Sequence, residues 1–564
     1  MTTTLRSHGG QAVHTFRRLN ELARLLRTVR HMRARQIIDR VSRKLLPVPV
    51  RKGPAPDLRP AALAWRNCPG RAPSMLSPTR FAFLSHTAEI TTQADWNGAH
   101  LSRLWRYNLH YFDDLRAEGA AQRLGWHRNL IERWIEENPP RYGAGWEPYP
   151  TSLRIVNWIA WALAGHELDH RAVQSLAVQA TSLNATLEFH LLGNHLLANA
   201  KALVFAGCFF SGDEADQWLR KGLDLLNTEF AEQVLEDGGH FELSPMYHAI
   251  VLEDVIDLVQ LSRLFPAQIG GNEQSWRMLA TRMLDWLHVM THPDGEIAFF
   301  NDAAFGVART HADLVEYGAL FGISSEHSTR TLTWLSASGY AHLRSGSFSA
   351  IFDAAEIGPA YLPGHGHADV LSLEISLDGR RLVTNGGTSS YEIGPVRTSE
   401  RASAAHATVE LDGHSSSETW SSFRVGRRAH PFEVRVAETV TEVTAAASHD
   451  GYRWLPGRPI HHRVVIVSPD ALRIVDTVTG AGDHSVVARF PLHPALTLAG
   501  ANADGWQLEL DDGRVIRLAI RGSVERCVFE GHFAPTFGQR VPRPVLAWRH
   551  KGALPLVVQT CFEL

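Results

Sequence analysis

The chain has 564 residues, 44% hydrophobic and 20% charged, and its 56 basic and 59 acidic side chains give a formal net charge of −3. A single hydrophobic core stops growing at about 250 to 300 residues, so this length predicts two domains and excludes peptide-sized and disulfide-stapled classes. The composition is typical of a soluble globular protein, and the near-neutral charge gives no overall field that would hold nucleic acid, so we expect no nucleic-acid partner.

The four cysteines are far apart and have no CxxC spacing, so we predict buried thiols.

The sequence predicts neither a membrane span nor a secretory signal. No apolar run of about 18 residues occurs, and the N-terminal segment lacks the apolar core of a secretory signal, so we expect no integral membrane segment. On these grounds we predict a cytoplasmic protein; a periplasmic or secreted location would need an export route that the sequence does not show.

Residues 1–78 are predicted to form a basic arm and a connector. Residues 1–52 contain 13 Lys or Arg against Glu21 and Asp39 only, with apolar residues between positions 19 and 29 spaced for a helix. Such a segment can lie on a membrane surface or bind an acidic polymer. The alternative, which we favour, is a helix that is partly docked on the protein and partly mobile. The proline-rich residues 46–78 predict an extended connector.

Residues 79–330 are predicted to form a helical domain. Apolar residues recur there at three- and four-residue intervals. The clearest segments are Trp126–Glu137, Ser152–Glu167, Ala172–Leu192, Ser211–Leu235 and Tyr247–Leu264. This succession predicts antiparallel helical hairpins, stacked or closed into a toroid.

Residues 331–564 are predicted to form an antiparallel β-sheet domain, because short strand-like runs alternate there with Gly and Asp at turns. The runs include Phe348–Phe352, Leu371–Leu377, Arg463–Val467, Leu472–Val475 and Val486–Phe490. We find no repeat of fixed period.

Two motifs in the helical half carry groups suited to proton transfer. Asn194 and His195 stand inside an apolar run; a buried Asn donates hydrogen bonds to a carboxylate, and a neighbouring His moves a proton. Further along, Glu242 can orient a neighbour, and Ser244-Pro245 starts a helix with Tyr247 in its first turn, where the helix dipole favours a phenolate. The alternatives are that the Asn-His pair only caps or bridges helices and that Tyr247 is structural.

The sheet half contains a histidine motif. His365 and His367 lie among glycines in a predicted loop, where both side chains can turn into a cleft. His367 and His406 with an oxygen ligand predict a zinc-type site, since imidazole suits zinc and other transition metals. The alternative is that these are ordinary surface histidines.

Carboxylates suggest a second chemistry. Glu147, Glu242 and either Asp294 or Asp302 can serve as the acid pair of a glycoside hydrolase, although nothing in the sequence fixes their separation. The chain has no nucleophile elbow, phosphate loop or dinucleotide fingerprint.

Taken together, these motifs resemble the heparinase II/III-like polysaccharide lyases. Several separated motifs in the right order are more specific than any single one, and the likeness covers about residues 105–493. The matching motifs are Trp105–Tyr111, Trp146–Pro150 with Arg154, Asn157 and Trp158, Gly193–His195, Phe241–His248, His365–Asp369, Ala405–Thr408, Asp412-Gly413 and His449–Tyr452. The resemblance implies an N-terminal α/α toroid, a C-terminal antiparallel β-sandwich, and cleavage of uronate-containing polysaccharide by β-elimination.

The resemblance also implies roles for particular residues. Removal of the C5 proton builds negative charge on the C6 carboxylate, so Asn194 and His195 would neutralise that group. Tyr247 and His365 would divide the proton transfers, one abstracting the C5 proton and the other, or Tyr247 again, protonating the leaving O4. Glucuronate and iduronate present this proton on opposite faces, so the epimer decides which residue does which.

Further residues are expected to bind substrate. They are Trp146, Glu147, Arg154, Glu242, His248, Arg397 and Arg401. The arginines are included because a guanidinium binds carboxylates and sulfates with two hydrogen bonds; the alternative for each is an internal salt bridge.

His367 and His406 resemble ligands of the metal that some family members hold. The metal would be divalent, zinc or manganese, and structural rather than catalytic, organising the loop that carries His365. The family's carboxylate ligand is expected near Asn385, where this chain has an amide, which is a weaker ligand.

We favour a lyase whose partner is an acidic polysaccharide or oligosaccharide, glycosaminoglycan-like or alginate-like. Without a secretion signal, such an enzyme would trim imported oligosaccharides or act in surface-polysaccharide metabolism. The alternatives are a glycoside hydrolase on the same scaffold and a non-catalytic glycan-binding protein. The presence of Asn194, His195, Tyr247 and His365 argues against a mere binding protein, which has no need of proton-transfer groups.

Overall fold

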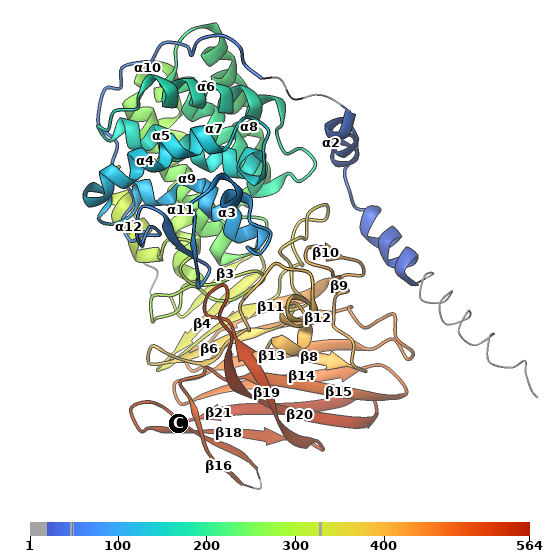
Figure 1. The fold of residues 1–564 in the computed structure, drawn as a ribbon. Coiled ribbons are helices and arrows are strands. Elements are labelled where there is room, and N and C mark those ends of the chain that lie inside the picture. The colour runs from blue at the N-terminus through green and yellow to red at the C-terminus, as the bar shows by residue number, and fades with distance from the viewer. Residues whose placement is uncertain (1–19, 46–47, 49, 326–329, 503) are drawn as a thin grey trace, which may run out of the picture.

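The computed structural model describes residues 20–45, 48, 50–325, 330–502 and 504–564. Helices make up the N-terminal half and antiparallel sheets the C-terminal half, one beside the other (Figure 1). This confirms the predicted fold class. Residues 1–19 of the predicted basic arm lie outside the described residues.

The helical half consists of helices joined by short loops. An arm at its start contains a helix over residues 20–29 and α2 (Ala34–Leu45), and a small hairpin of β1 (Arg80–Phe83) and β2 (His86–Glu89) follows. The α-helices after it are α3 (Arg103–Tyr111), α4 (Leu124–Glu137), α5 (Pro148–Leu163), α6 (His170–Ala185), α7 (Gly193–Phe209), α8 (Asp213–Gln233), α9 (Pro245–Leu264), α10 (Pro266–Ile269), α11 (Glu273–Val289) and α12 (His311–Ala319).

Helix α7 is the central helix of this half, buried along nearly its whole length. It packs against α5 and α8, while α9 packs against α11. Two glycines allow α7 and α8 to approach closely: a Cβ atom on Gly207 would lie 2.6 Å from the Cβ of Leu219, and one on Gly222 would lie 2.9 Å from the carbonyl oxygen of Ala200. The largely apolar sequence of α7 follows from this central position.

The predicted helix Ala172–Leu192 is too long, because α6 ends at Ala185. Residues 186–192 form a loop, and it closes with positive φ angles at Leu192 (65°) and Gly193 (58°). The apolar spacing continues through this loop because its residues also face the core. The loop is held by Glu188, whose backbone N–H donates to Oδ1 of Asn199 at 2.8 Å.

In the part of the sheet half that the structure describes, there are three larger antiparallel sheets. Their strand orders are β11-β12-β13-β14-β21-β18-β17-β16, β19-β20-β15-β8 and β3-β4-β5-β6-β7. The strands are β3 (Leu332–Leu335), β4 (Tyr340–Ser345), β5 (Phe348–Asp353), β6 (Leu373–Leu377), β7 (Arg380–Val383), β8 (Val409–Leu411), β9 (Thr419–Trp420), β10 (Arg424–Val425), β11 (Pro431–Glu438), β12 (Val443–His449), β13 (Ile460–Val467), β14 (Ala471–Thr479), β15 (Asp483–Pro491), β16 (Thr497–Asn502), β17 (Gly505–Glu509), β18 (Val515–Arg521), β19 (Glu525–Phe533), β20 (Val541–Ala553) and β21 (Leu556–Glu563). A short helix, α13 (Pro395–Glu400), precedes β8.

All three sheets contribute to one apolar core, which includes Phe348, Ile375, Val465 and Trp548. Alternating burial along β13 and β14 shows the period of two from which the strands were predicted. The five predicted strand runs fall in β5, β6, β13, β14 and β15, with Leu371 just before its strand.

The two halves are joined by apolar packing. Trp286 and Phe300 of the helical half share a core cluster with Tyr340 and Ile351 of the sheet half. This packing fixes the walls of the space between the halves.

All four cysteines are free thiols, and three of them agree with the prediction of burial. Cys68, Cys208 and Cys561 are buried, whereas Cys527 is half-buried. Among the described residues, no helix is both long and apolar enough to span a lipid bilayer.

Candidate active site

A cavity of about 1120 Å³ is lined by residues of both halves. The helical half contributes residues of α3, α5, α7 and α9, and the sheet half contributes loops around positions 362–365, 391–393 and 421–424. The four predicted catalytic residues all line it: Asn194, His195, Tyr247 and His365.

Asn194 is held by Glu242 at the start of α7. Its Nδ2 donates to both carboxylate oxygens of Glu242, at 3.0 and 2.8 Å, and its backbone N–H donates to Oε1 at 3.2 Å. Gly193 makes this contact accessible: a Cβ atom there would lie 2.4 Å from Glu242 Oε1 and 2.4 Å from a methyl carbon of Leu362. The amide is therefore fixed with one side against Glu242.

His195 is the second polar group of this wall. Its Nδ1 lies 3.1 Å from Oε1 of Glu188, and its ring packs 4.3 Å from that of Tyr149. Burial opposes the charged form, but the carboxylate of Glu188 outweighs burial and raises the pKa of His195 above its ordinary value. His195 can therefore present a positive charge to an anion in the cavity.

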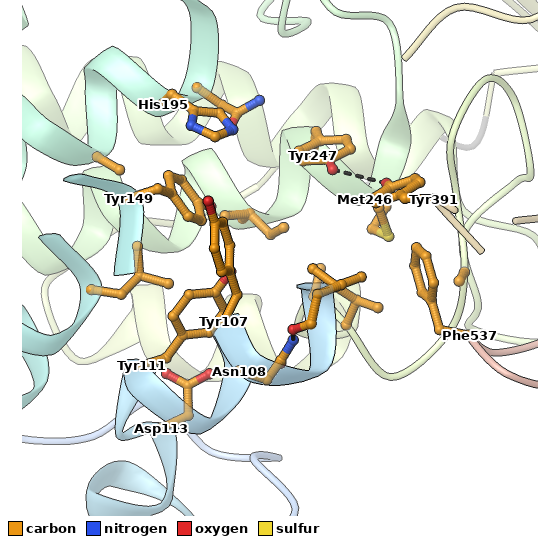
Figure 2. A pocket seen from close by; sticks show the side chains of 18 of the residues that line it. Tyr107, Asn108, Tyr111, Asp113, Tyr149, His195, Met246, Tyr247, Tyr391 and Phe537 are labelled. Carbon is orange, nitrogen blue, oxygen red and sulfur yellow. Dashed lines mark hydrogen bonds between the residues drawn. The ribbon is translucent and has the colours of Figure 1, made fainter. Parts of the chain in front are cut away.

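Tyr247 lies on the other side of the cavity from His195 and Tyr149 (Figure 2). Its hydroxyl is 2.8 Å from that of Tyr391, and its ring lies 4.0 Å from the imidazole of His365. Burial and the neighbouring Tyr391 raise the pKa of Tyr247 well above its ordinary value. The helix dipole was expected to favour a phenolate, but burial is the larger effect, so the phenol is protonated at neutral pH.

His365 is oriented by a carboxylate that the sequence suggested only as a hydrolase candidate. Nδ1 of His365 lies 2.9 Å from Oδ2 of Asp302. Asp302 is fully buried and also accepts hydrogen bonds from His367, Thr388 and Arg397. Burial opposes its ionisation, but Arg397 and the two histidines hold its pKa well below the usual range. The ionised carboxylate places the proton of His365 on Nδ1, which leaves Nε2 as an acceptor.

The three predicted substrate-binding arginines do not line the cavity, contrary to the expectation. Arg397 pairs with Asp302, and Arg401 donates to the carbonyl oxygens of Gly366 and Ser422. Arg154 donates to Gln179 at 2.9 Å and to the carbonyl of His110. All three side chains are buried, so internal partners take up their donors.

Two further residues that were predicted to bind substrate also lie outside the lining of the cavity. Trp146 is half-buried, and its indole N–H donates to the carbonyl of Asn138 at 3.0 Å. His248 is fully buried, with Nε2 2.8 Å from the carbonyl oxygen of Met283. Both have structural partners behind the cavity wall.

Glu147 and Glu242 do line the cavity, together with aromatic residues that the sequence did not single out. Glu147 accepts hydrogen bonds from Tyr107 and Arg103. The further aromatic lining residues include Tyr107, Tyr111, Tyr149, Tyr391 and Phe537 (Figure 2). Tyr107 and Tyr111 fall inside the Trp105–Tyr111 motif, and Tyr149 inside Trp146–Pro150, so their positions in these motifs were an available signal.

The buried histidines of the sheet half suit a metal ion. His367, Asp369 and His406 each offer a ligand atom, all within 4.8 Å of one another. Nδ1 of His367 faces Nε2 of His406 at 3.3 Å. Burial lowers the pKa of both rings, so each is neutral with a single N–H.

The second nitrogen of each ring has an oxygen partner. His367 Nε2 lies 2.9 Å from Oδ1 of Asp302, and His406 Nδ1 lies 3.0 Å from Oδ1 of Asn385. With both N–H groups used there, two lone pairs face each other beside Asp369, as metal ligands do. The predicted ligand Asn385 lies beside this group, with its Oδ1 against His406, and Asp369 is a further candidate for the oxygen ligand.

A helical half and an antiparallel sheet half, with an Asn–His pair and a Tyr–His pair lining one cavity between them, define a two-domain α+β protein. Two family models match the chain: heparinase II/III N-terminus over residues 132–325, and heparinase II/III-like, C-terminal, over residues 327–549. The chain belongs to the heparinase II/III-like family, as its motifs predict.

Curated relatives match over part of their length. A heparin-sulfate lyase of Bacteroides stercoris is 34% identical over 114 residues, which is 20% of this chain and 17% of the relative. A heparin-sulfate lyase of Pedobacter heparinus is 28% identical over 247 residues, which is 39% of this chain and 36% of the relative. The matched regions thus span well under two thirds of these relatives.

The solved structures extend the likeness in fold. A crystal structure of heparinase III has a TM-score of 0.68 at 18% identity and covers 83% of this chain and 79% of its own. At that identity the likeness concerns the fold alone.

Proposed function

We propose that this protein is a lyase that cleaves a uronate-containing, glycosaminoglycan-like saccharide by β-elimination and leaves a 4,5-unsaturated uronate. The observation that carries the proposal is that Tyr247 and an Asp302-oriented His365 lie side by side in the same cavity as Asn194 and His195. The family and the heparin-sulfate lyases among its relatives support the same reaction.

The first requirement is to neutralise the substrate carboxylate. Its charge disfavours loss of the C5 proton, because the carbanion formed delocalises onto the same group. His195, whose pKa Glu188 raises, supplies a positive charge, and Asn194 supplies an amide donor that Glu242 holds in place. Both residues stand at the N-terminus of α7, where the helix dipole also favours an anion.

The second requirement is a base and an acid. Nε2 of His365 accepts the C5 proton, the electron pair forms the C4–C5 double bond, and the C4–O4 bond breaks. Tyr247, protonated in its buried position, gives its proton to the leaving O4. A proton transfer from the His365 imidazolium to the Tyr247 phenolate, over adjacent rings, restores both groups.

The position of these two groups favours one stereochemistry. His365 and Tyr247 lie side by side, so proton removal and proton delivery occur on the same face of the sugar. The C5 hydrogen and O4 share a face in glucuronate and mannuronate, but not in their C5 epimers iduronate and guluronate. We therefore propose a glucuronate or mannuronate at the cleavage point.

The candidate metal would be held by His367, Asp369 and His406. A divalent ion bound there would hold these three ligands in place by its charge. Through Asp302 and residues 364–369 it would also stabilise the position of His365. We propose this structural role and route no proton transfer through the ion.

Glu147, Glu242 and Asp302, which the sequence suggested for hydrolysis, have other partners in the structure. Glu242 is occupied by Asn194, Glu147 by Arg103 and Tyr107, and Asp302 by its four donors. A glycosidase needs one protonated carboxyl group that is free to reach the glycosidic oxygen. The elimination mechanism therefore fits the site better.

The test is to incubate the purified protein with hyaluronan, chondroitin, heparan sulfate and alginate fragments and follow the ultraviolet absorbance of unsaturated uronate. Absorbance that grows with one substrate and is abolished by Tyr247→Phe supports elimination. New reducing ends without absorbance would contradict it and indicate hydrolysis. Cleavage of an iduronate-containing but not a glucuronate-containing substrate would overturn the stereochemical assignment alone.

A further inference from the structure

The N-terminal arm, residues 20–45, is attached to the protein through polar contacts. In its first helix, Arg24 and Arg27 donate to the carboxylate of Glu418, at 3.2 and 2.9 Å. Thr28 accepts a hydrogen bond from the indole N–H of Trp420 at 3.1 Å. One face of this helix, made of hydrophilic side chains, is thus turned toward the sheet half.

Helix α2 is attached in the same manner to both halves. Gln36 is buried and donates to the carbonyl of Tyr361, and Asp39 accepts from the backbone N–H of His190 at 3.0 Å. Arg43 donates to carbonyl oxygens of the loop after α6 and also lines the cavity. The hydrophilic face again points inward.

The apolar residues of both helices point outward. They are Leu22, Leu25, Leu26 and Val29 in the first helix, and Ile37, Ile38, Val41 and Leu45 in α2. Their exposed fractions run from 39% to 74%. In each helix the four residues fall within about 100° of the helical wheel and make one continuous stripe.

This arrangement is the reverse of that of an ordinary surface helix, which buries its apolar stripe and exposes its polar face. Contiguous apolar surface left in water is unfavourable and marks an interaction site. The arm stands at one edge of the molecule (Figure 1), so its stripes are open to a large, extended partner.

Charge distinguishes between the partners that such a surface can take. Arg30 and Arg40 are exposed on the same arm, Arg35 is exposed but stacks on the ring of Phe189, and Asp39 is turned inward against Arg43. A second copy of this chain would bring arginines against arginines. An anionic lipid surface accepts apolar side chains at its acyl boundary and supplies negative headgroups for the arginines.

We propose that the arm binds the protein to an anionic membrane surface, with its two apolar stripes in the lipid interface and its polar face on the protein. The inference rests on the arm alone and is independent of the proposed enzymatic reaction.

The test is co-sedimentation of the full chain with vesicles of phosphatidylcholine and phosphatidylglycerol, compared with vesicles of phosphatidylcholine alone. We expect binding to the anionic vesicles that weakens with added salt. The double variant Leu26→Glu/Ile38→Glu should bind at least about tenfold more weakly, because it places two carboxylates in the interface. Both residues are exposed, so the fold is not expected to suffer.

A matched control carries the same change in charge elsewhere. Val440→Glu/Val557→Glu alters two exposed apolar residues of the sheet half, 104% and 58% exposed, and should bind like the wild type. Equal binding of the wild type and the arm variant would overturn the proposal, as would binding no better to anionic than to neutral vesicles. A dimer in light scattering that only the arm variant dissociates, without vesicle binding, would also overturn it and identify a second copy as the partner.

Discussion

One carboxylate, that of Asp302, connects His365 and His367. Its Oδ2 lies 2.9 Å from Nδ1 of His365, and its Oδ1 lies 2.9 Å from Nε2 of His367. The proposed base and a candidate metal ligand are therefore oriented by the same buried group. A substitution at either histidine is therefore expected to change the orientation of the other ring through this carboxylate.

Asp302→Asn tests this connection. The amide keeps the shape but cannot hold the proton of His365 on Nδ1, so kcat should fall by roughly 10³- to 10⁴-fold. The buried Arg397 also loses its countercharge, which should lower the free energy of unfolding by about 3–5 kcal/mol. Absorbance kinetics and thermal unfolding measure the two effects. Asp294→Asn, which alters a more exposed carboxylate bound to Arg381, serves as the control and should retain kcat.

If Asp302→Asn loses stability but retains the kcat and pH profile of the wild type, its role is structural and the assignment of His365 as base is wrong.

The hydroxyl pair of Tyr247 and Tyr391 makes an asymmetric prediction. Tyr247→Phe removes the proposed acid and should lower kcat by at least about 10²-fold with little change in KM. Tyr391→Phe removes only the hydrogen-bond partner of the phenolate, so its kcat should fall by about tenfold or less. Steady-state kinetics on the same substrate compare the two. An equal or larger loss for Tyr391→Phe would reverse the assignment of the acid.

The raised pKa of His195 predicts a shift in pH dependence. The imidazolium is present below this raised pKa and is lost as the pH rises through it, so wild-type activity should decline on that alkaline side. Glu188→Gln removes the carboxylate that raises the pKa and leaves burial, which lowers it. The alkaline limb of the kcat/KM profile should therefore move to lower pH.

The positive charge of His195 also contributes to the free energy of unfolding, and this contribution likewise decreases as the pH rises. Because the folded pKa of His195 is raised, its contribution is fully present below the ordinary pKa and disappears as the pH rises through the folded value. The exposed-residue variant Glu525→Gln should show the wild-type profile. An alkaline limb that stays in place in Glu188→Gln would show that His195 does not bear the required charge.

The candidate metal site predicts different results for Asp369 and Asn385. Asp369→Asn weakens a proposed metal ligand directly. Asn385→Ala removes only the hydrogen-bond partner of His406 and should lower the affinity for zinc by about 10- to 100-fold. Zinc content after dialysis and the change in Tm on adding a chelator measure both. Full zinc content in Asp369→Asn, together with loss in Asn385→Ala, would restore the ligand set expected from the sequence.

The architecture could be predicted from the sequence because positions that are buried at regular intervals carry apolar residues at the same intervals. Alternation along β13 and three- to four-residue spacing along α4 identify strand and helix directly. The same rule placed the end of α6 too late, since residues 186–192 include four apolar side chains and yet form a loop. Periodicity reports burial, and it cannot report that the backbone has left the helix.

Side-chain partners were harder to foresee. Arg154, Arg397 and Arg401 have the chemistry to bind an anion, but whether a guanidinium faces a cavity or an internal acceptor depends on contacts distant in sequence. Asp302 is 63 residues from His365, and that separation hid their pairing. Asp369 lies two positions after His367, but a neighbouring acid in sequence becomes a candidate ligand only once the loop geometry is known.

Gly193 offers a test of how tightly the amide of Asn194 must be held. Its φ is +58°, and an added Cβ atom would lie 2.4 Å from both Glu242 Oε1 and Leu362 Cδ2. Gly193→Ala should therefore displace Glu242, release Asn194 and lower kcat/KM by about 10- to 100-fold, since small misplacements of a catalytic group cost this much. Gly165→Ala provides the matched control, because Gly165 has a φ of +97° and nothing within 4 Å of an added Cβ atom. Both variants bear the backbone strain of a positive φ and should lose stability, but only Gly193→Ala should lose activity at a temperature where both are folded. Equal activities of the two variants would mean that the contact between Glu242 and Asn194 is not needed for the reaction.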